Sequence, residues 1–143
     1  MRYFFYGTLL DAVVRREVLR RDVAQGHLCR AVLAGYRRVY RIGATYPVLV
    51  PEPTGRVEGL LVRGLSVRDA ARLATYEGPE YSLFKTAVRA NDGAVVSART
   101  FLPRRTGLGS SEEWCFEDWQ RRFAETFRAQ VTRRRQAPSP LVR

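Results

Sequence analysis

The pattern of apolar and polar positions predicts a short strand at the start of the chain and a helix after it. Residues 3–6 are all aromatic and are followed by Gly7, which indicates a buried strand that ends in a turn. Asp11 is suited to cap the next segment, where apolar residues recur at helical spacing. We therefore expect a first helix that Asp11 caps and that runs to Arg21.

The middle of the chain is rich in β-branched and aromatic residues, which favours strands joined by turns. Residues 28–42 predict two short strands with a bend or bulge at Gly35. Residues 46–50 are expected to be extended, and residues 57–62 predict a further strand. Between them, residues 51–55 contain two prolines and a glycine and predict a turn.

The next stretch predicts a helix and a β-hairpin. Ser66 with Asp69 three positions later resembles a capping box, and the Gly-Pro pair after Glu77 predicts the end of that helix. The sequence Asn-Asp-Gly at 91–93 separates two strand-like runs and is a strong hairpin signal.

An aromatic stripe marks the C-terminal helix, which we expect at about 111–132. Its members recur at steps of three and four residues, a spacing typical of core packing: Phe116, Trp119, Phe123 and Phe127. The tail 133–143 is basic, contains two prolines and is expected to be disordered.

The order of these elements favours an α+β domain over residues 1–132, with a small mixed or antiparallel barrel and flanking helices. The predicted strands connect mostly through turns rather than through crossover helices, which argues against a doubly wound sheet. A chain of 143 residues has the length of one ordinary domain.

Charge is the most unusual feature of the composition. The net charge is +11, and Lys85 is the only lysine among 25 basic residues. Such a charge raises the question of nucleic acid, but the arginines are scattered rather than gathered in one helix or tail, so we expect no nucleic-acid partner. No apolar run has the length of a signal peptide or a membrane span, and we expect a cytoplasmic protein.

The residues that could carry chemistry are few. The sequence has no glycine-rich phosphate loop and no nucleophile elbow, and it has no spacing suited to a metal site. Its single histidine, His27, and its two isolated cysteines, Cys29 and Cys115, argue against a metal centre or a Cys–His dyad, and we expect no cofactor. Carboxylates, backbone amides and hydroxyls remain.

Glu77 is the best candidate on physical grounds. It lies in the last turn of its helix, where the negative end of the helix dipole disfavours an ionised carboxylate and so raises its pKa. An apolar environment would raise the pKa as well. Both effects suit a general acid/base, although an exposed glutamate at a helix end is the more common case. The turn after the first strand, Tyr6-Gly7-Thr8-Leu9, is a second candidate, because its backbone N–H groups suit an anion. The same residues could equally form an ordinary strand-to-helix turn without a ligand.

The motifs taken together resemble the gamma-glutamylcyclotransferase-like superfamily, in particular its compact bacterial branch with the gamma-glutamylamine cyclotransferases and the avirulence-induced plant proteins. The resemblance rests on short segments in the right order, over about residues 2–103. These segments are Phe5-Tyr6-Gly7-Thr8-Leu9, Gly43-Ala44-Thr45-Tyr46-Pro47, Val57-Glu58-Gly59 and Leu73-Ala74-Thr75-Tyr76-Glu77-Gly78, with Tyr81 shortly after.

This resemblance implies an enzyme of the cyclotransferase type. It implies that Glu77 is the general acid/base and that Tyr6, Gly7, Thr8, Leu9 and Tyr81 bind a small gamma-glutamyl substrate. The substrate's own α-amine would attack the γ-amide and release 5-oxoproline and an amine, without a metal or cofactor.

The sequence also departs from the family's pattern at three positions. Ala74, Leu83 and Phe101 stand where an aspartate, a basic residue and a tyrosine are usual. Two alternatives therefore stay open: an inactive homologue that acts as a binding protein and, more distantly, a nucleic-acid-binding module.

Overall fold

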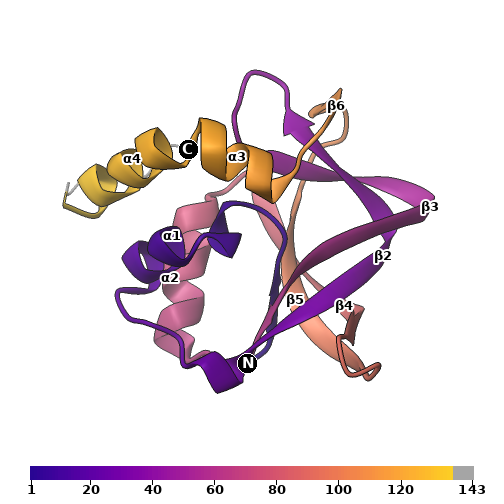
Figure 1. The fold of residues 1–143 in the computed structure, drawn as a ribbon, viewed down its shortest axis with the longest axis horizontal. Helices are drawn as coiled ribbons and strands as arrows, with labels where there is room; N and C mark the ends of the chain where they lie inside the picture. The colour runs from indigo at the N-terminus through magenta and orange to yellow at the C-terminus, as the bar shows by residue number, and fades with distance from the viewer. Residues whose placement is uncertain (137–143) are drawn as a thin grey trace.

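A closed five-stranded barrel with helices packed along one side forms the core of the computed structural model, which describes residues 1–136 (Figure 1). The strands are β1 (Tyr3–Phe5), β2 (Leu28–Arg41), β3 (Pro47–Val62), β4 (Tyr81–Ala90), β5 (Val95–Pro103) and β6 (Gly109–Glu113). The α-helices are α1 (Ala12–Leu19), α2 (Val67–Glu77), α3 (Phe116–Arg122) and α4 (Ala124–Gln136), with 3₁₀ turns η1 (Thr8–Leu10) and η2 (Gln25–His27). The α+β barrel predicted from the sequence is confirmed.

Strand β1 lies in the middle of the barrel wall and is the reason that the N-terminal run is wholly aromatic. It pairs antiparallel with β3 and parallel with β5, the one parallel contact in the described sheet. Because side chains alternate along a strand, Phe4 and Tyr6 point into the barrel, whereas Tyr3 and Phe5 pack toward the helices. Both faces of the strand are buried, so no polar residue alternates with the aromatic ones.

Strands β2 and β3 form a long antiparallel hairpin that bends to close the barrel. Gly35 has a φ of 90° and stands at the bulge predicted there, but β2 continues through it as one strand. The turn predicted at residues 51–55 is wrong, because β3 runs through this stretch. The register passes from Ala34↔Arg56 to Tyr36↔Pro51, so the extra residues of β3 face the bulge, where a proline displaces no ladder hydrogen bond.

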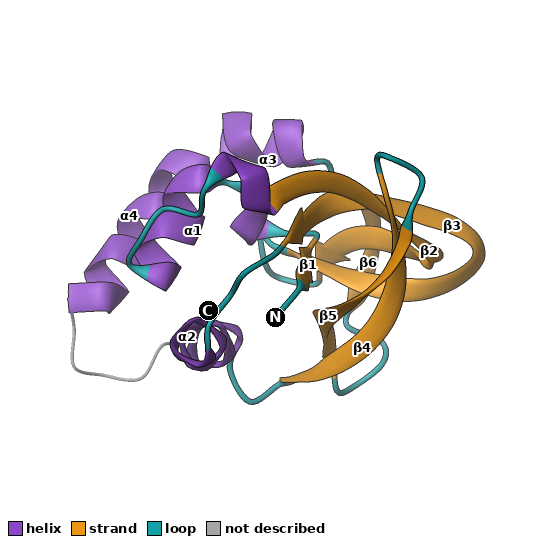
Figure 2. Ribbon diagram, turned by 90° about the horizontal axis from the view of Figure 1, so that it is seen from below, coloured by secondary structure: helices purple, strands orange, loops and turns teal. Residues whose placement is uncertain are grey.

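The helices cover the outer face of β1 and its neighbours, so that apolar side chains fill the space between the two layers (Figure 2). Helix α2 begins at the predicted capping box: Asp69 N–H donates to Ser66 Oγ, and Ser66 N–H donates to the carboxylate of Asp69. Arg21 pairs with the same carboxylate at 2.7 Å and is the main reason that the pKa of Asp69 falls to about 2. None of the helices described over residues 1–136 is long and apolar enough to cross a membrane.

The C-terminal region differs from the single helix expected at about 111–132. Residues 109–113 form β6, which pairs with the end of β2, and the aromatic stripe is divided between α3 and α4 with a break at Phe123. The stripe packs as predicted, since Trp119 and Phe127 belong to the buried core. Of the tail expected to be disordered, residues 133–136 lie in α4 and residues 137–143 lie outside the described part of the chain.

We predict that Gly59→Ala destabilises the protein by at least about 2 kcal/mol, because overpacking forces the surrounding atoms to shift. A Cβ atom at Gly59 would lie 2.4 Å from the carbonyl oxygen of Phe5 and 2.5 Å from the ring of Phe4. Urea unfolding followed by circular dichroism measures the free energy of unfolding. Gly26→Ala is the matched control, since its Cβ would meet no atom within 4 Å; equal stability of the two variants would contradict the prediction.

Candidate functional site

A narrow pocket at the end of β1 brings the two candidate motifs together. It is lined by Tyr6, Gly7, Thr8 and Leu9 from the turn after β1 and by Glu77 from the end of α2, with Pro47 and the Phe4, Phe5, Thr100 and Phe101 positions completing the wall. We refer to it as the Glu77 pocket. Residues about 70 positions apart in the sequence therefore share one cavity, and the free volume in it is about 20 Å³, room for about one water molecule.

The turn after β1 is a single 3₁₀ turn that presents its N–H groups. Leu10 N–H donates to Gly7 O at 2.9 Å and Asp11 N–H donates to Thr8 O at 3.1 Å. The first N–H groups of such a turn, those of Thr8 and Leu9, have no acceptor inside the turn itself. Pro47 lies against Gly7, where a Cβ atom would meet the proline ring at 3.1 Å, so a side chain at position 7 would crowd this wall of the pocket.

A buried hydrogen bond joins this turn to the helix that carries Glu77. The hydroxyls of Thr8 and Tyr76 lie 2.6 Å apart, and both side chains are almost completely buried. Tyr76 immediately precedes Glu77, and Gly78 ends α2 with a φ of 83°. The bond therefore fixes the last turn of α2 against the turn after β1, with the half-buried Glu77 carboxylate at the negative end of the helix.

Two half-buried arginines hold the carbonyl groups of the same turn. Arg38 donates to the carbonyl oxygens of Tyr6 at 2.9 Å and of Glu58 at 2.8 Å, and its guanidinium lies over the ring of Trp114. Arg15 donates to the carbonyls of Leu9 and Leu10. Burial lowers the pKa of both arginines from the ordinary value, but a guanidinium stays charged at neutral pH. Neither arginine was among the predicted site residues, because no local pattern shows which carbonyl groups the fold places beside an arginine.

Asp11 connects the turn to the C-terminal helices. It caps α1 by accepting from Val14 N–H at 3.0 Å, and it pairs with Arg128 of α4 and accepts from Gln120 of α3. Its side chain is 1% exposed. Burial raises the pKa of Asp11, but the hydrogen bonds from Arg128, Val14 and Gln120 outweigh burial and hold the pKa below its ordinary value.

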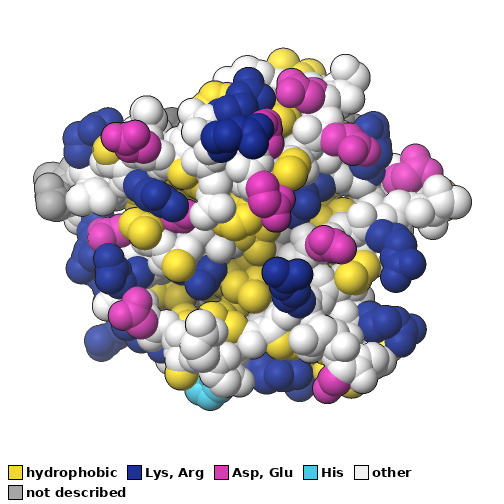
Figure 3. All heavy atoms as spheres, viewed as in Figure 1, with side chains coloured by type: hydrophobic (Ala, Val, Ile, Leu, Met, Phe, Trp, Pro, Cys, Tyr) yellow, Lys and Arg dark blue, Asp and Glu magenta, His cyan; other side chains and the backbone are white. Residues whose placement is uncertain are grey.

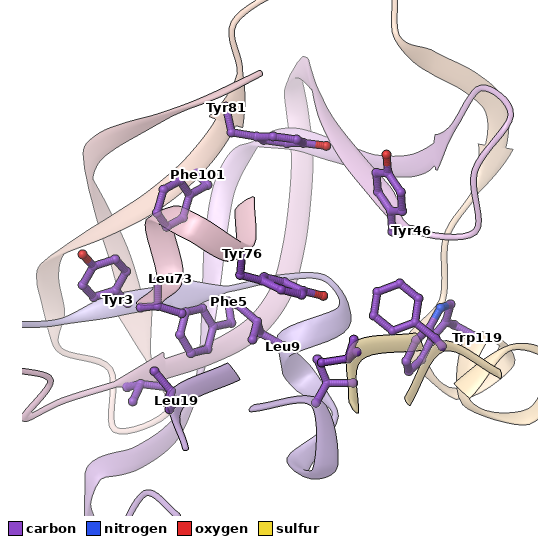
Figure 4. Close-up of a cluster of buried hydrophobic side chains, with 14 of the residues drawn as sticks. Tyr3, Phe5, Leu9, Leu19, Tyr46, Leu73, Tyr76, Tyr81, Phe101 and Trp119 are labelled. Atoms are coloured by element: carbon purple, nitrogen blue, oxygen red, sulfur yellow. The ribbon is translucent and has the colours of Figure 1, made fainter. Parts of the chain in front are cut away.

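Tyrosine hydroxyls surround the outer part of the site. Figure 4 shows the side chains of Tyr46 and Tyr81 with their hydroxyls directed toward one another, above that of Tyr76. Tyr81 is the one predicted substrate-binding residue that does not line the Glu77 pocket; it lines a neighbouring hollow instead. Tyr46 was not among the predicted site residues, although the Tyr-Pro sequence at 46–47 was the available signal.

The three departures from the family's pattern meet in that neighbouring hollow. Ala74, Leu83 and Phe101 all line it, and only Phe101 also lines the Glu77 pocket. The polar groups missing at positions 74 and 83 are therefore missing beside the candidate site and not in its wall. Within residues 1–136 no three His, Cys, Asp or Glu side chains lie close enough together to hold a metal ion.

Comparison with known proteins finds a matching family model, relatives in sequence and solved structures with a similar fold. The family model "Gamma-glutamyl cyclotransferase, AIG2-like" matches residues 3–121. Protein AIG2 C of Arabidopsis thaliana is 31% identical over 136 residues, with 87% of this chain and 78% of the relative covered. A solution structure of an Arabidopsis thaliana protein has a TM-score of 0.68 at 27% identity and covers 96% of this chain and 84% of its own. A solved gamma-glutamyl cyclotransferase is similar in fold, with a TM-score of 0.51 at 17% identity and coverage of 73% and 66%.

We predict that Asp11→Asn lowers the free energy of unfolding by about 1–3 kcal/mol at pH 7, because the charge of Arg128 loses its buried partner. A carboxylate whose pKa is depressed by folding stabilises the protein above its unfolded pKa of about 3.9, and this contribution is lost as the pH falls through the folded value. The difference from the wild type should therefore narrow below about pH 4. Urea unfolding at pH 7, 5 and 3 measures it.

The control is Asp92→Asn, in the exposed hairpin turn, where the side chain accepts from Ala94 N–H and an asparagine keeps that acceptor. This variant should match the wild type at each pH. An Asp11→Asn variant as stable as the wild type at pH 7 would rule out the proposed role of Asp11.

Proposed function

The chain belongs to the gamma-glutamyl cyclotransferase, AIG2-like family, and on this basis we propose that it is an enzyme that converts a gamma-glutamyl amide into 5-oxoproline and a free amine. The observation that carries the proposal is the Glu77 pocket. It combines the one carboxylate of the pocket lining with the turn that the resemblance assigns to the glutamyl group.

The proposed reaction is an intramolecular acyl transfer. The ammonium of the substrate loses a proton to Glu77, and the resulting amine attacks the γ-carbonyl to close a five-membered ring. When the tetrahedral intermediate collapses, the bond to the leaving nitrogen breaks and Glu77 returns the proton to that nitrogen. One hydrogen stays on the ring nitrogen, and the second proton shed by the ammonium is taken up by the leaving amine.

The remaining groups of the pocket have roles that suit this chemistry. Because both reacting groups belong to one substrate molecule, holding that substrate in a bent conformation with the two groups close together removes much of the entropic barrier to ring closure. The backbone N–H groups of Gly7 and Thr8 are suited to the developing oxyanion or to the substrate's α-carboxylate. Tyr6 and Leu9 form the adjacent wall, and Tyr81 would approach the substrate through its hydroxyl from the outer side.

The small volume of the pocket sets a condition on this proposal. A glutamyl group is much larger than the one water molecule that the free space of about 20 Å³ admits. Binding must therefore displace side chains of the wall, which includes Pro47 and Phe101. Conformational steps that accompany substrate binding are common in enzymes.

The polar groups absent at Ala74, Leu83 and Phe101 favour the second candidate, a homologue that binds a ligand without turning it over. In this case the Glu77 pocket would recognise the glutamyl group but would not orient it for ring closure. Binding of a substrate without release of 5-oxoproline distinguishes this function from catalysis.

We further propose a cytoplasmic location and a small-molecule substrate. Cys29 and Cys115 are free thiols, as is usual in a reducing compartment. The leaving amine is not specified by the wall of the Glu77 pocket, so a panel of gamma-glutamyl amides is needed to identify it.

We predict that Glu77→Gln lowers kcat for 5-oxoproline release by about 10²–10⁴-fold, the usual contribution of a general acid/base. Release from a panel of gamma-glutamyl amino acids, polyamines and isopeptides is measured by mass spectrometry. The substituted side chain is isosteric, so circular dichroism should show an unchanged fold.

Glu80→Gln is the matched control. Glu80 lies three residues further on, is exposed and pairs with Arg41 at 3.1 Å outside the Glu77 pocket, so its loss should leave kcat nearly unchanged. Full activity of Glu77→Gln would remove Glu77 from the reaction, whereas no release by the wild type across the panel would favour the binding protein.

A further inference from the structure

A second concave site lies on the outer face of the barrel, near the start of β1. It has a volume of about 440 Å³, and Arg2, Arg63, Lys85 and Arg99 line it without any carboxylate. We refer to it as the basic hollow. Its other lining residues are Met1, Gly64, Ser97 and Ala98, none of which balances the charge.

The basic side chains of this hollow have no acidic partner in the described part of the chain. The ion pairs of residues 1–136 involve other arginines, such as Arg21 and Arg128, whereas the four side chains here appear in none of them. Arg2 is held by a hydrogen bond from its Nε to the carbonyl of Ser97 at 2.8 Å. That bond fixes the guanidinium over β5 and leaves its terminal nitrogens for a ligand.

Two of these charges oppose each other directly across the sheet. Lys85 of β4 is in register with Arg99 of β5. Like charges at directly opposite positions of an antiparallel pair destabilise it, so the folded protein holds a repulsion here that a bound anion would relieve.

Another hollow lies next to the basic hollow along β4 and β5. It has a volume of about 540 Å³, shares Arg99 with the basic hollow and lies between α2 and the strands. Its lining is more apolar and aromatic, with Tyr3, Leu83 and Phe101, and Arg104 is anchored at its edge by a hydrogen bond to Pro79 O at 2.9 Å. We refer to it as the side hollow; Leu83, one of its lining residues, is 44% exposed.

The register of β4 and β5 places the two hollows next to each other on the same face of the sheet. The pair Leu83↔Phe101 precedes the pair Lys85↔Arg99 by two residues, so both pairs present their side chains on the same face, about 7 Å apart. The sites therefore form one amphipathic groove, with an apolar half next to α2 and a cationic half next to the start of β1.

We propose that this groove is a binding site for a small organic phosphate, with its phosphate groups in the basic hollow and an apolar or aromatic part in the side hollow. Guanidinium groups bind phosphate oxygens in a bidentate manner, and several cations without a carboxylate favour a multiply charged anion over a single carboxylate. A nucleoside diphosphate has the required combination of charge and planar ring. The groove shares only Phe101 with the lining of the Glu77 pocket, and its side hollow also contains Tyr81, which the resemblance assigns to the gamma-glutamyl substrate.

The net charge of the protein does not by itself account for this groove. On the face shown in Figure 3, basic side chains are spread out and interspersed with acidic ones. The basic hollow differs because its lining contains cations only.

The test is binding of ADP, with inorganic pyrophosphate and adenosine as the two separate halves, measured by isothermal titration calorimetry at low and at physiological salt. We expect ADP to bind more tightly than either half. Lys85→Gln should weaken ADP binding about tenfold, the usual effect of removing one charged hydrogen bond, and Leu83→Ser should weaken ADP but not pyrophosphate. Because the cross-strand repulsion disappears, Lys85→Gln should have an unchanged or higher Tm, which shows that it folds.

Arg56→Gln is the matched control, since this exposed arginine of β3 lines neither hollow and its loss lowers the net charge equally. Binding by Arg56→Gln and by Glu77→Gln should equal that of the wild type. The proposal is overturned by no binding of ADP, by equal losses in Lys85→Gln and Arg56→Gln, by pyrophosphate binding as tight as that of ADP, or by binding of a single-stranded oligonucleotide alone. Because no turnover is measured, the result is independent of whether the protein is a cyclotransferase.

Discussion

The structure depends on the burial of one short strand from all sides. Strand β1 has β3 on one edge and β5 on the other, and both of its faces are covered by apolar clusters. Its ladder with β5 contains the single pair Tyr3↔Arg99, so side chains continue the connection: Tyr6 Oη donates to Phe101 O at 2.6 Å and Thr100 Oγ1 donates to Phe4 O at 2.9 Å. Because the strand cannot shift, the turn that follows it has a fixed position at the barrel's end.

The helices are attached to this turn by polar contacts, and α2 thereby brings Glu77 next to it. The Thr8–Tyr76 hydrogen bond attaches the end of α2 to the turn, and Asp11 attaches the turn to the C-terminal helices through Arg128. Each contact joins segments that are far apart in the sequence, and each includes at least one buried side chain whose polar group would be costly to leave unpaired. The Glu77 pocket is therefore maintained by the same polar contacts that hold the helical layer to the barrel.

The arginines of this chain have different roles according to their surroundings. Arg15 and Arg38 hold carbonyl groups around the turn, and Arg21 and Arg128 neutralise buried aspartates. These residues are structural, and their charge is used within the fold. The cations of the basic hollow lack such partners among the described residues, and this contrast distinguishes a binding surface from a generally positive protein.

The sequence by itself determined the features whose causes lie within a few residues. The buried strand at 3–6, the capping box of Ser66 and Asp69, the hairpin at 91–93 and the aromatic stripe follow from local spacing and local capping, and Glu77 could be singled out from its place at a helix end. Tertiary structure alone decided what depends on a distant partner. It made residues 109–113 a strand and carried β3 through the prolines at 51 and 53, because both segments pair with β2, and no local pattern shows which strand will lie beside them. It also brought Arg38, Tyr46 and Asp11 to the site, since the value of a polar side chain there depends on which carbonyl or carboxylate the fold places against it.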